Sequence, residues 1–461
     1  MDTIFDAELI RRYDRPGPRY TSYPTAPQFH GQFGSVDYAR EAERSNASGR
    51  PLSLYLHIPF CRSSCYYCGC TRIITRNRER GRHYLDRLLK EIAIQGALFD
   101  RSRAVDQLHF GGGTPTFYTP EELAEVFACM EQHFGLHRGA QRDYGIEIDP
   151  RTANPKALRA LHALGINRVS LGVQDFDAEV QQAVNRVQSV AETSDLVHEA
   201  RAAGMRSVNF DLIYGLPKQS LDGFARTLDT VVELRPDRVA AYSYAHLPEI
   251  FPAQTVIRSA DLPSAETKLK LLELTIARLT AAGYVHIGMD HFALPEDELA
   301  RAQADGSLWR NFQGYTTKSG CDLVAFGMSA IGQVGDAYCQ NEKTWAEYLA
   351  AIDQGVLPIH RGLIVDADDR LRREVIRRVM CFGQLDYAAI EASFDIDFRA
   401  YFATALARLS QAASDGLVEL RSDSLQVTPR GALLLRVVAM AFDAYATGER
   451  QSAAARFSRV V

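Results

Sequence analysis

Between residues 52 and 289 the sequence alternates short apolar runs, typical of β-strands, with longer amphipathic runs, typical of α-helices. Strands are predicted at Leu52–Ile58, Tyr144–Ile148, Arg168–Val173, Ser207–Ile213, Arg238–Tyr244 and Tyr284–Met289, and a further strand, second in order, ends in Leu108-His109-Phe110. Strands that alternate with helices indicate right-handed βαβ units and a parallel sheet. The pattern therefore predicts an α/β fold, a partial or full TIM-type (β/α) barrel, and an open doubly wound sheet is the alternative.

The predicted strands and helices alternate in only one part of the chain, and this divides the chain into three predicted parts. Residues 1–50 form an N-terminal extension, residues 51–360 the barrel, and residues 361–461 a small α-rich C-terminal domain. Within the barrel, helices are predicted at Tyr84–Phe99, from about Glu121, and at Pro155–Leu164, Ala191–Ala203, Asp222–Leu234 and Ala265–Ala282. In the C-terminal part the predicted helices are Leu371–Met380, Asp386–Phe394, Phe398–Ser414 and Gly431–Ala446, with a hairpin of Leu417–Leu420 and Leu425–Thr428.

Composition excludes several classes of protein. The chain has 461 residues, of which 46% are apolar and 24% charged, and its net charge is −5. The negative charge argues against a general nucleic-acid binder, which needs a basic patch. No apolar run approaches the length of a membrane span. The N-terminus is acidic and mixed, unlike a signal or transit peptide, so we expect a cytoplasmic protein. We also expect a monomer, because no long apolar helix face is left unassigned.

Four of the eight cysteines lie within ten residues, directly after the first predicted strand. Cys61, Cys65 and Cys68 form a C-x3-C-x2-C pattern, and Cys70 follows. Zinc sites usually come as two separated halves, and no second half lies nearby. Three thiolates on one loop leave a metal with an open coordination position, which suits a catalytic iron–sulfur cluster. Buried thiols or a structural zinc loop are the alternatives, and a disulfide is disfavoured in a reducing cytoplasm.

Polar residues follow nearly every predicted strand. After the cysteines they are the Gly111–Thr114 run, Glu147 and Asp149, Gln174 and Asp175, Asp211, Tyr244 and His246, and Asp290 and His291. In a barrel these positions lie at the end of the strands that carries active sites, although helix capping explains some of the acids. The glycine run lacks both the phosphate-loop and the dinucleotide fingerprints. It therefore predicts an uncharged or zwitterionic ligand, with a plain tight turn as the alternative.

Three further features suggest binding groups. Glu147 and Asp149 lie on one face of their strand, so a carboxylate there can pair with an ammonium group or a ribose diol. Arg186 suits a bidentate bond to a carboxylate, although a surface salt bridge is the alternative. The segment Gly17–Thr25 contains two prolines and cannot form a regular helix. Its aromatic rings and guanidinium suit a flat ring system that carries carboxylates, with a surface linker as the alternative.

Taken together, these motifs resemble the oxygen-independent coproporphyrinogen III oxidases of the radical S-adenosylmethionine (SAM) superfamily. Tyr67, an aromatic residue before the third cysteine, belongs to the superfamily signature. The likeness extends along nearly the whole chain through the following blocks: GPRYTSYPTA (17–26), LHIPFC (56–61), CGC (68–70), FGGGTPT (110–116), GVQDF (172–176), VNR (184–186), DLIYGLPKQ (211–219), YAHLP (244–248), IGMDHFA (287–293), RNFQGYTT (310–317) and FSRV (457–460).

The resemblance implies cofactors and residue roles. Cys61, Cys65 and Cys68 would hold a [4Fe–4S] cluster, whose fourth iron binds SAM, and Cys70 would not be a ligand. A second SAM molecule would lie beside the first. Contacts to the first SAM would come from Tyr55, Gly112, Glu147 and Ile331, and contacts to the second from Tyr67, Gly113, Thr114, Gln174, Arg186, Asp211 and Ala245. Arg19, Tyr20 and Tyr23 would help to close the substrate site.

The resemblance also implies a reaction. A reduced cluster would cleave SAM to a 5′-deoxyadenosyl radical, which takes a hydrogen atom from a propionate side chain. Two propionates of coproporphyrinogen III would become vinyl groups, giving protoporphyrinogen IX for heme biosynthesis. The expected partners are this tetrapyrrole and an electron donor such as flavodoxin or ferredoxin, with no nucleic acid and no membrane.

Three alternative functions remain open at this point. A heme-binding or heme-transfer protein of the same superfamily typically lacks Cys70 and the Gly17–Thr25 segment, and both are present here. A radical SAM enzyme acting on another tetrapyrrole could open or methylate heme, and methylation would normally need further dedicated cysteines, which are not evident. A zinc-stabilised structural protein would leave the polar strand ends unexplained. A Cys65→Ala variant separates the last class, because a zinc scaffold would lose its fold.

Overall fold

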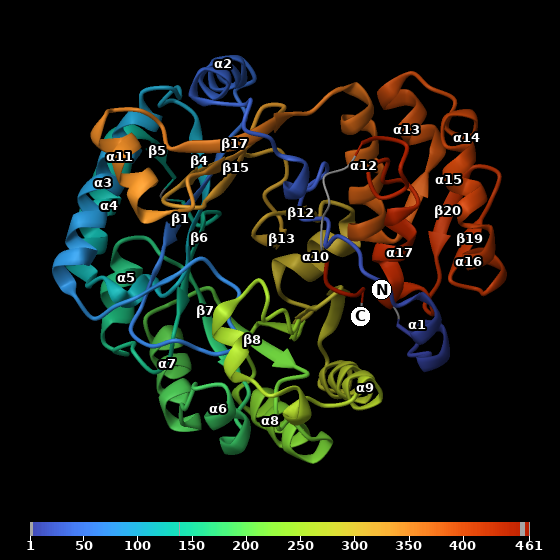
Figure 1. Cartoon of the computed structure of the whole chain (residues 1–461), viewed down its shortest axis with the longest axis horizontal. Coiled ribbons are helices and arrows are strands. Elements are labelled where there is room, and N and C mark those ends of the chain that lie inside the picture. The colour runs from blue at the N-terminus through green and yellow to red at the C-terminus, as the bar shows by residue number, and fades with distance from the viewer. Residues whose placement is uncertain (1–2, 138, 452–456, 461) are drawn as a thin grey trace. The chain divides into compact units, whose positions relative to one another are not determined.

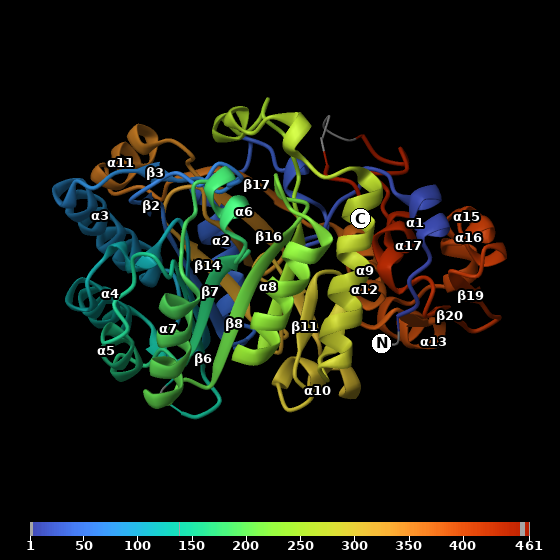
Figure 2. The same cartoon turned by 90° about the horizontal axis from the view of Figure 1, so that it is seen from below.

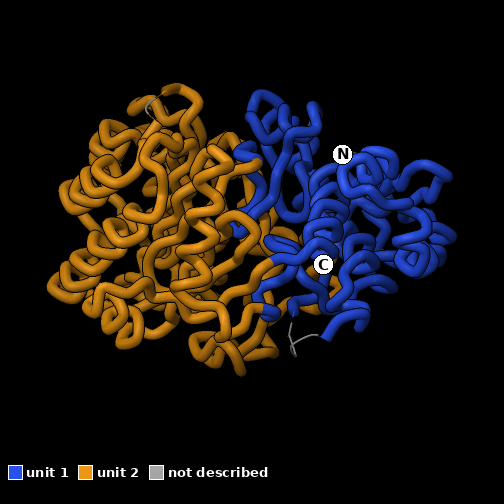
Figure 3. Tube along the Cα trace, turned by 90° about the horizontal axis from the view of Figure 1, so that it is seen from above, with its two compact units in different colours: residues 1–28, 272–319, 365–461 blue, residues 29–271, 320–364 orange. Residues whose placement is uncertain are grey.

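The computed structural model describes residues 3–137, 139–451 and 457–460. The chain folds into two compact units, which Figure 3 shows in different colours. Unit 1 contains residues 1–28, 272–319 and 365–461, and unit 2 contains residues 29–271 and 320–364. In the described part of the chain, no helix is long and apolar enough to cross a membrane.

A parallel sheet forms the centre of unit 2. Its parallel strands, in spatial order, are β9 (Arg238–Ser243), β8 (Ser207–Tyr214), β7 (Arg168–Gln174), β6 (Asp143–Ile148), β4 (Ala104–Gly112), β1 (Leu52–Ile58) and β14 (Asp322–Phe326). The sheet continues with the antiparallel strands β15 (Ile331–Val334), β16 (Ala337–Asn341) and β17 (Ile359–Ile364). This confirms the predicted radical SAM type of α/β fold, a partial rather than a full barrel.

Helices cover the outer face of this sheet, as Figures 1 and 2 show. They are α3 (Arg78–Gly96), α4 (Pro120–His133), α5 (Ala157–Ala163), α6 (Ala178–Ala183), α7 (Val190–Ala202) and α8 (Leu221–Leu234). α4 begins as predicted, because Thr119 and Glu122 form a capping box and Pro120 is the first helical residue. α3 begins before the predicted helix, since Asn77 caps a polar first turn that carries no apolar periodicity.

The register of the parallel strands aligns their carboxyl ends. Ile58 at the end of β1 pairs with Gly112 of β4, and Gly172 of β7 pairs with Asp211 of β8. Leu54 and Leu56 of β1 are fully buried, which fixes the strand in the sheet. The loops that carry the cysteines, the glycine run and the acidic residues therefore leave the sheet along one edge.

Unit 1 contains a strand that differs from the sequence prediction. The run predicted at Tyr284–Met289 forms β10 (Val285–Gly288), which pairs antiparallel with β11 (His291–Ala293). It is therefore a hairpin strand and not another parallel barrel strand. Left-handed backbone at Met289 turns the chain between the two strands. A second hairpin follows, formed by β12 (Trp309–Asn311) and β13 (Gly314–Thr316).

The C-terminal part of unit 1 is α-rich, as predicted. It contains α12 (Ala367–Phe382), α13 (Tyr387–Phe394), α14 (Phe398–Tyr401), α15 (Ala403–Arg408), α16 (Ser410–Ser414) and α17 (Leu435–Met440). The predicted hairpin is present as β19 (Val418–Leu420) and β20 (Ser424–Val427), and β18 (Gln384–Asp386) adds a third strand. The helix predicted at Gly431–Ala446 is shorter, because the Asp443 carboxylate accepts from the amides of Tyr445 and Ala446 and turns the chain.

The N-terminal region is more structured than the predicted extension. α1 (Ala7–Tyr13) and α2 (Ser35–Asn46) are regular helices, and the segment between Gly17 and Thr25 holds none, as expected. Residues 1–28 belong to unit 1, whereas α2 belongs to unit 2. The division at residues 50 and 360 into three consecutive domains stays a prediction.

Candidate active site

The cysteine loop is held in a defined shape by its own backbone and by Arg72. β2 (Phe60–Cys61) pairs with β3 (Ile73–Ile74), which closes the loop at its base. Inside it, the Arg72 guanidinium donates to the carbonyl oxygens of Cys68 at 3.0 Å and Cys65 at 3.3 Å. One side chain thus fixes the backbone at two of the three predicted ligands. The sequence analysis did not single out Arg72, because nothing in the pattern shows that its side chain folds back into the loop.

The three sulfur atoms lie among hydrogen-bond donors. Cys65 Sγ accepts from Arg151 Nη2 at 3.3 Å and from Arg186 Nη1 at 3.4 Å. Cys61 Sγ accepts from the Thr114 hydroxyl at 3.5 Å. Donors and positive charge stabilise thiolates, which are the form that binds iron. The donor set therefore fits an iron–sulfur cluster on these cysteines.

The fourth cysteine of the loop contacts the third. The backbone amide of Cys70 donates to Cys68 Sγ at 3.4 Å. A hydrogen bond from the Cys70 side chain lowers the pKa of Cys68 to about 6, whereas burial raises the pKa of Cys61 to about 11. Cys70 thus lies beside a predicted ligand and supports its thiolate form.

The glycine run after β4 lies against β1 and the cysteine loop. The amide of Gly113 donates to the Ile58 carbonyl at 2.8 Å, and the amide of Thr114 to the Phe60 carbonyl at 2.8 Å. Gly112 has a φ of 110°, and a Cβ there would come within 2.5 Å of the His57 ring. Only glycine fits this close approach. The run therefore packs tightly against β1 and holds the start of the cysteine loop through its backbone amides.

Glu147 of β6 reaches across to this glycine run. Its carboxylate accepts from the amide of Gly112 at 3.1 Å and lies 3.2 Å from His109 Nε2. Burial opposes ionisation, but the bonds from His109 and Gly112 hold the pKa of Glu147 below its usual value. The Tyr55 ring stacks on His109 at 6.1 Å between ring centroids. The structure thus brings three of the predicted first-SAM residues together, with the Glu147 carboxylate partly exposed so that a ligand can reach it.

Ile331 begins β15, whereas the other residues of this set lie on β1, β4 and β6. In the ladders, Tyr55 pairs with Ala325 of β14, and Leu323 of the same strand pairs with Gln333. Ile331 therefore lies two strands from Tyr55, toward the carboxyl end of β14. No hydrogen bond or ring contact connects it to the rest of the set among the described residues, and its role stays a prediction.

Arg186 lies at the centre of the predicted second-SAM residues. Its guanidinium donates to the Gly172 carbonyl at 2.6 Å and to Cys65 Sγ, and lies 3.4 Å from the carboxylate of Asp149. This buried ion pair excludes the surface salt bridge considered from the sequence. Asp149 also binds Arg151 at 2.6 Å, so it positions two arginines near one thiol.

Asp211 and Gln174 extend this region along the strand ends. Asp211 accepts from Ser170 at 2.7 Å and from Asn209 at 3.0 Å, and burial raises its pKa to about 6. Gln174 ends β7 with a φ of 66°, a left-handed backbone that non-glycine residues adopt rarely. Strain of this kind is concentrated at functional sites. Both residues therefore lie where the barrel fold predicts ligand contacts.

Gln254 connects the last two predicted cofactor residues. Its side-chain amide donates to the carbonyl of Tyr67 at 2.9 Å and to that of Ala245 at 3.2 Å. The cysteine loop and the segment after β9 are thus held together by one buried glutamine. Sequence reasoning missed Gln254, because it lies in an irregular segment with no motif of its own.

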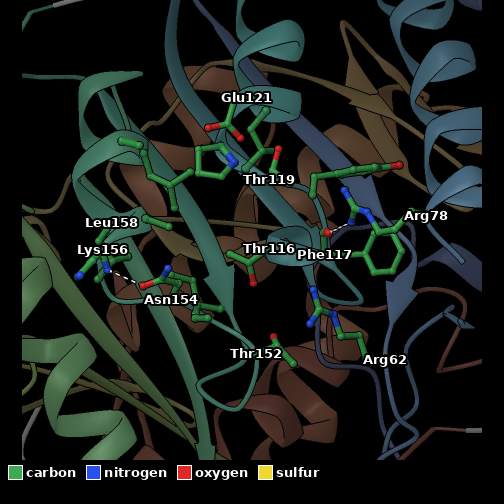
Figure 4. A pocket seen from close by; sticks show the side chains of 18 residues that line it. Arg62, Arg78, Thr116, Phe117, Thr119, Glu121, Thr152, Asn154, Lys156 and Leu158 are labelled. Carbon is green, nitrogen blue, oxygen red and sulfur yellow. Dashed lines mark hydrogen bonds between the residues drawn. The ribbon is translucent and has the colours of Figure 1, made fainter. Parts of the chain in front are cut away.

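A cavity of about 500 Å³ lies outside the sheet, beside the cysteine loop (Figure 4). Thr116 and Phe117 from the loop after β4 line it, together with Thr152 and Lys156 from the loop after β6. Arg62, which lies between the first two cysteines, is at its edge. This surface is distinct from the carboxylate and glycine contacts described above.

The predicted substrate residues Arg19, Tyr20 and Tyr23 lie in unit 1. Arg19 forms an ion pair with Asp290. Tyr20 and Tyr23 are 5% and 2% exposed and pack within the apolar core of that unit. The Tyr20 hydroxyl donates to Asp443 at 2.9 Å, so the tyrosines stabilise unit 1. Their contact with a substrate stays a prediction.

Comparison with known proteins places these features in context. Residues 55–231 match the family model of the radical SAM superfamily, and residues 365–434 match that of the HemN C-terminal domain. An oxygen-independent coproporphyrinogen III oxidase of Pseudomonas aeruginosa is 52% identical, with 100% of each chain covered. The Escherichia coli protein of that name is 46% identical over 99% of this chain and 98% of the relative.

A solved structure shows the same fold. The structure titled as the coproporphyrinogen III oxidase HemN from Escherichia coli, a radical SAM enzyme, superposes with a TM-score of 0.92 at 45% identity. The match covers 96% of this chain and 100% of that chain.

Proposed function

Because this chain belongs to the oxygen-independent coproporphyrinogen III oxidases, we propose that the residues around its cysteine loop carry out the chemistry of that family. The chain is a radical SAM oxidoreductase of heme biosynthesis. It converts coproporphyrinogen III to protoporphyrinogen IX by oxidative decarboxylation without dioxygen. When bound, the [4Fe–4S] cluster and SAM supply the 5′-deoxyadenosyl radical that removes a hydrogen atom from a propionate.

The proposed residue roles follow from the contacts. Cys61, Cys65 and Cys68 hold the cluster, and Arg72 fixes the loop that carries them. Glu147, held ionised by the Gly112 amide and by His109, binds a positive or hydroxyl group of the first SAM. Arg186 binds the carboxylate of a second SAM. The single observation that carries this assignment is the convergence of thiols, guanidinium groups and a partly exposed carboxylate at the carboxyl ends of adjacent strands.

The chain's own residues also position one another around the site. The Tyr55, His109 and Glu147 side chains are packed against one another, and Tyr55 also lies 3.2 Å from His57 through its hydroxyl. These contacts hold the three side chains in fixed positions, and groups fixed in this way align a bound cofactor with its reaction partner. A count of two SAM molecules and a monomeric, cytoplasmic enzyme stay part of the proposal.

The function is tested with iron-reconstituted protein in an anaerobic assay. We expect SAM, dithionite, an electron acceptor and coproporphyrinogen III to yield protoporphyrinogen IX, CO₂ and 5′-deoxyadenosine together. If 5′-deoxyadenosine forms without the vinyl product, the radical chemistry holds and the substrate assignment fails. If no product forms and heme binds tightly, a heme-transfer function replaces the proposal.

The cluster also needs an electron from outside, and we propose that an acidic one-electron carrier such as flavodoxin or ferredoxin delivers it at the cavity of Figure 4. Arg62 and Arg76 line the adjoining cavity of about 480 Å³, and Lys156 lines the first. All three side chains belong to exposed residues. Positive charge beside a redox centre attracts an acidic partner and speeds its association.

This docking site gives a prediction for the double variant Arg76→Glu/Lys156→Glu. With reduced flavodoxin as the donor, we expect product formation at low salt to fall about tenfold, because the charge complementarity is reversed. With dithionite as the donor, the rate should stay unchanged. Arg301→Glu, an exposed substitution on α10 (Glu298–Asp305), serves as the control and should leave both rates unchanged. If the flavodoxin-driven rate of the double variant is unchanged, this surface is not the docking site.

A further inference from the structure

Unit 1 contains a compact group of charged side chains, of which only Arg19 has a predicted role above. Arg19, Asp290, Arg310 and Arg436 come from the N-terminal segment, the β10–β11 turn, β12 and α17. Arg19 donates to the Asp290 carboxylate, and Arg310 Nη2 donates to the Arg19 carbonyl at 3.3 Å. We call these four residues the arginine cluster.

The arginine cluster has an excess of positive charge. It contains three guanidinium groups and one carboxylate. Burial opposes ionisation of Asp290, but Arg19, His291 and Arg310 hold the pKa of its carboxyl below the usual value. Burial and the repulsion from Arg19 lower the pKa of Arg436 to about 10. Each of these shifts indicates that the surroundings favour an anion.

The role of Arg436 in this cluster is purely structural. It is 3% exposed, and its guanidinium donates to the carbonyl oxygens of Pro18 at 2.9 Å and Arg459 at 2.9 Å. Its remaining N–H groups are used as well, with bonds to Gly17, Ser458 and Val460. Arg436 thus braces the N-terminal segment against the end of the chain, and its donors are satisfied.

Arg310 differs from Arg436 in this respect. It is only 8% exposed, yet its Nε and Nη1 atoms are buried and have no hydrogen-bond partner among the described residues. The ring of Tyr315 covers one face of its guanidinium at 4.6 Å. Leaving a buried donor unpaired costs about 1–3 kcal/mol, and more for a charged group. The Nε and Nη1 atoms of Arg310 therefore lack an anionic acceptor.

We propose that Arg310, with Arg19 beside it, binds a propionate carboxylate of the tetrapyrrole substrate. The inference rests on the proposed function, because coproporphyrinogen III carries four propionates. A carboxylate accepts from guanidinium N–H groups through charge-assisted bonds and would neutralise part of the excess charge. Asp290 orients Arg19, and Arg436 holds the backbone that carries it, so both act as positioning residues.

The carboxylate bound here is one of the two that the product keeps. A propionate that reacts loses its carboxylate as neutral CO₂, gives one electron to the acceptor and keeps its other two carbons as the vinyl group. A strong pair with a guanidinium would stabilise the charged carboxylate and oppose that loss. A retained propionate stays ionised throughout both decarboxylations. It can therefore anchor the macrocycle while the reacting groups change.

The test measures binding of porphyrins that do not react. Reconstituted protein with SAM and no reductant is titrated with coproporphyrin III, which keeps all four propionates, and with protoporphyrin IX, which has only the two retained ones. For Arg310→Gln we expect the Kd of both porphyrins to rise about tenfold to a hundredfold. Arg310→Lys keeps the charge without the planar fork, so a smaller rise is expected. The tetramethyl ester of coproporphyrin III should bind wild type and variants equally.

The outcomes separate this inference from the proposed function. If wild-type protein does not bind coproporphyrin III, the substrate assignment fails. If it binds and both variants bind equally well, only the carboxylate site fails. If the variants lose affinity for coproporphyrin III but not for protoporphyrin IX, Arg310 does not bind a propionate that the product keeps. If they lose affinity equally for the tetramethyl ester, the role of Arg310 is structural. Arg301→Gln, exposed on α10, is the control for a lost surface arginine, and circular dichroism of Arg310→Lys checks that the fold is intact.

Discussion

The Cys61→Ala, Cys65→Ala and Cys68→Ala variants are expected to lose the iron–sulfur cluster and with it more than about 10³-fold of the activity. Each of the three sulfur atoms accepts a hydrogen bond from a neighbouring side chain or amide. Among the described residues, Cys70 carries the one other thiol group of this loop. The measurement is iron content per chain together with the yield of 5′-deoxyadenosine after anaerobic reconstitution.

Cys70→Ala is the matched control for this series. The backbone amide of Cys70, not its side chain alone, contacts Cys68, so the loop keeps that bond after the substitution. We therefore expect the variant to retain its iron. A Cys70→Ala protein without iron, or a Cys65→Ala protein with a full cluster, would contradict the assignment of the three ligands. Circular dichroism distinguishes these losses from unfolding, which a zinc scaffold would undergo.

Glu147→Gln should have the second-largest effect. The substitution keeps the size of the side chain but removes the partly exposed negative charge that accepts from Gly112 and faces His109. A hydrogen bond between charged groups contributes about 1.5–3 kcal/mol, so loss of the one to SAM is expected to lower SAM affinity and 5′-deoxyadenosine formation at least about tenfold. Equilibrium binding of SAM to the reconstituted protein, followed by single-turnover formation of 5′-deoxyadenosine, measures both effects.

Glu125→Gln provides a control on the surface of the same unit. Glu125 lies on α4 and pairs with Arg82, and both side chains are more than one-third exposed. Exposed pairs contribute little, so neither SAM binding nor cleavage should change. If Glu147→Gln binds and cleaves SAM within about threefold of wild type, Glu147 does not contact the cofactor, and its role is to hold His109 and the glycine run in place.

Local sequence patterns were sufficient for most elements of the sheet. The strands at Leu52–Ile58 and Arg168–Gln174 alternate apolar residues with polar or small ones, and Thr119 with Pro120 marks the start of α4. Such signals act over a few residues and need no distant partner. The pattern failed at β10, because an apolar run of that length is compatible with a parallel or an antiparallel neighbour.

The sequence by itself determined the cysteine spacing, the glycine run and the order of polar residues along the strands. Only the tertiary structure decided which other residues these residues contact. Arg72 and Gln254 have no motif, yet they hold the cysteine loop because the chain folds back on itself there. Nothing in the sequence distinguishes Arg310 from Arg436. Only their surroundings show that the Arg436 guanidinium is fully hydrogen-bonded, whereas two nitrogen atoms of Arg310 have no partner among the described residues. The physical reason is that hydrogen-bond satisfaction and burial are properties of neighbours far apart in the chain, which local periodicity cannot encode.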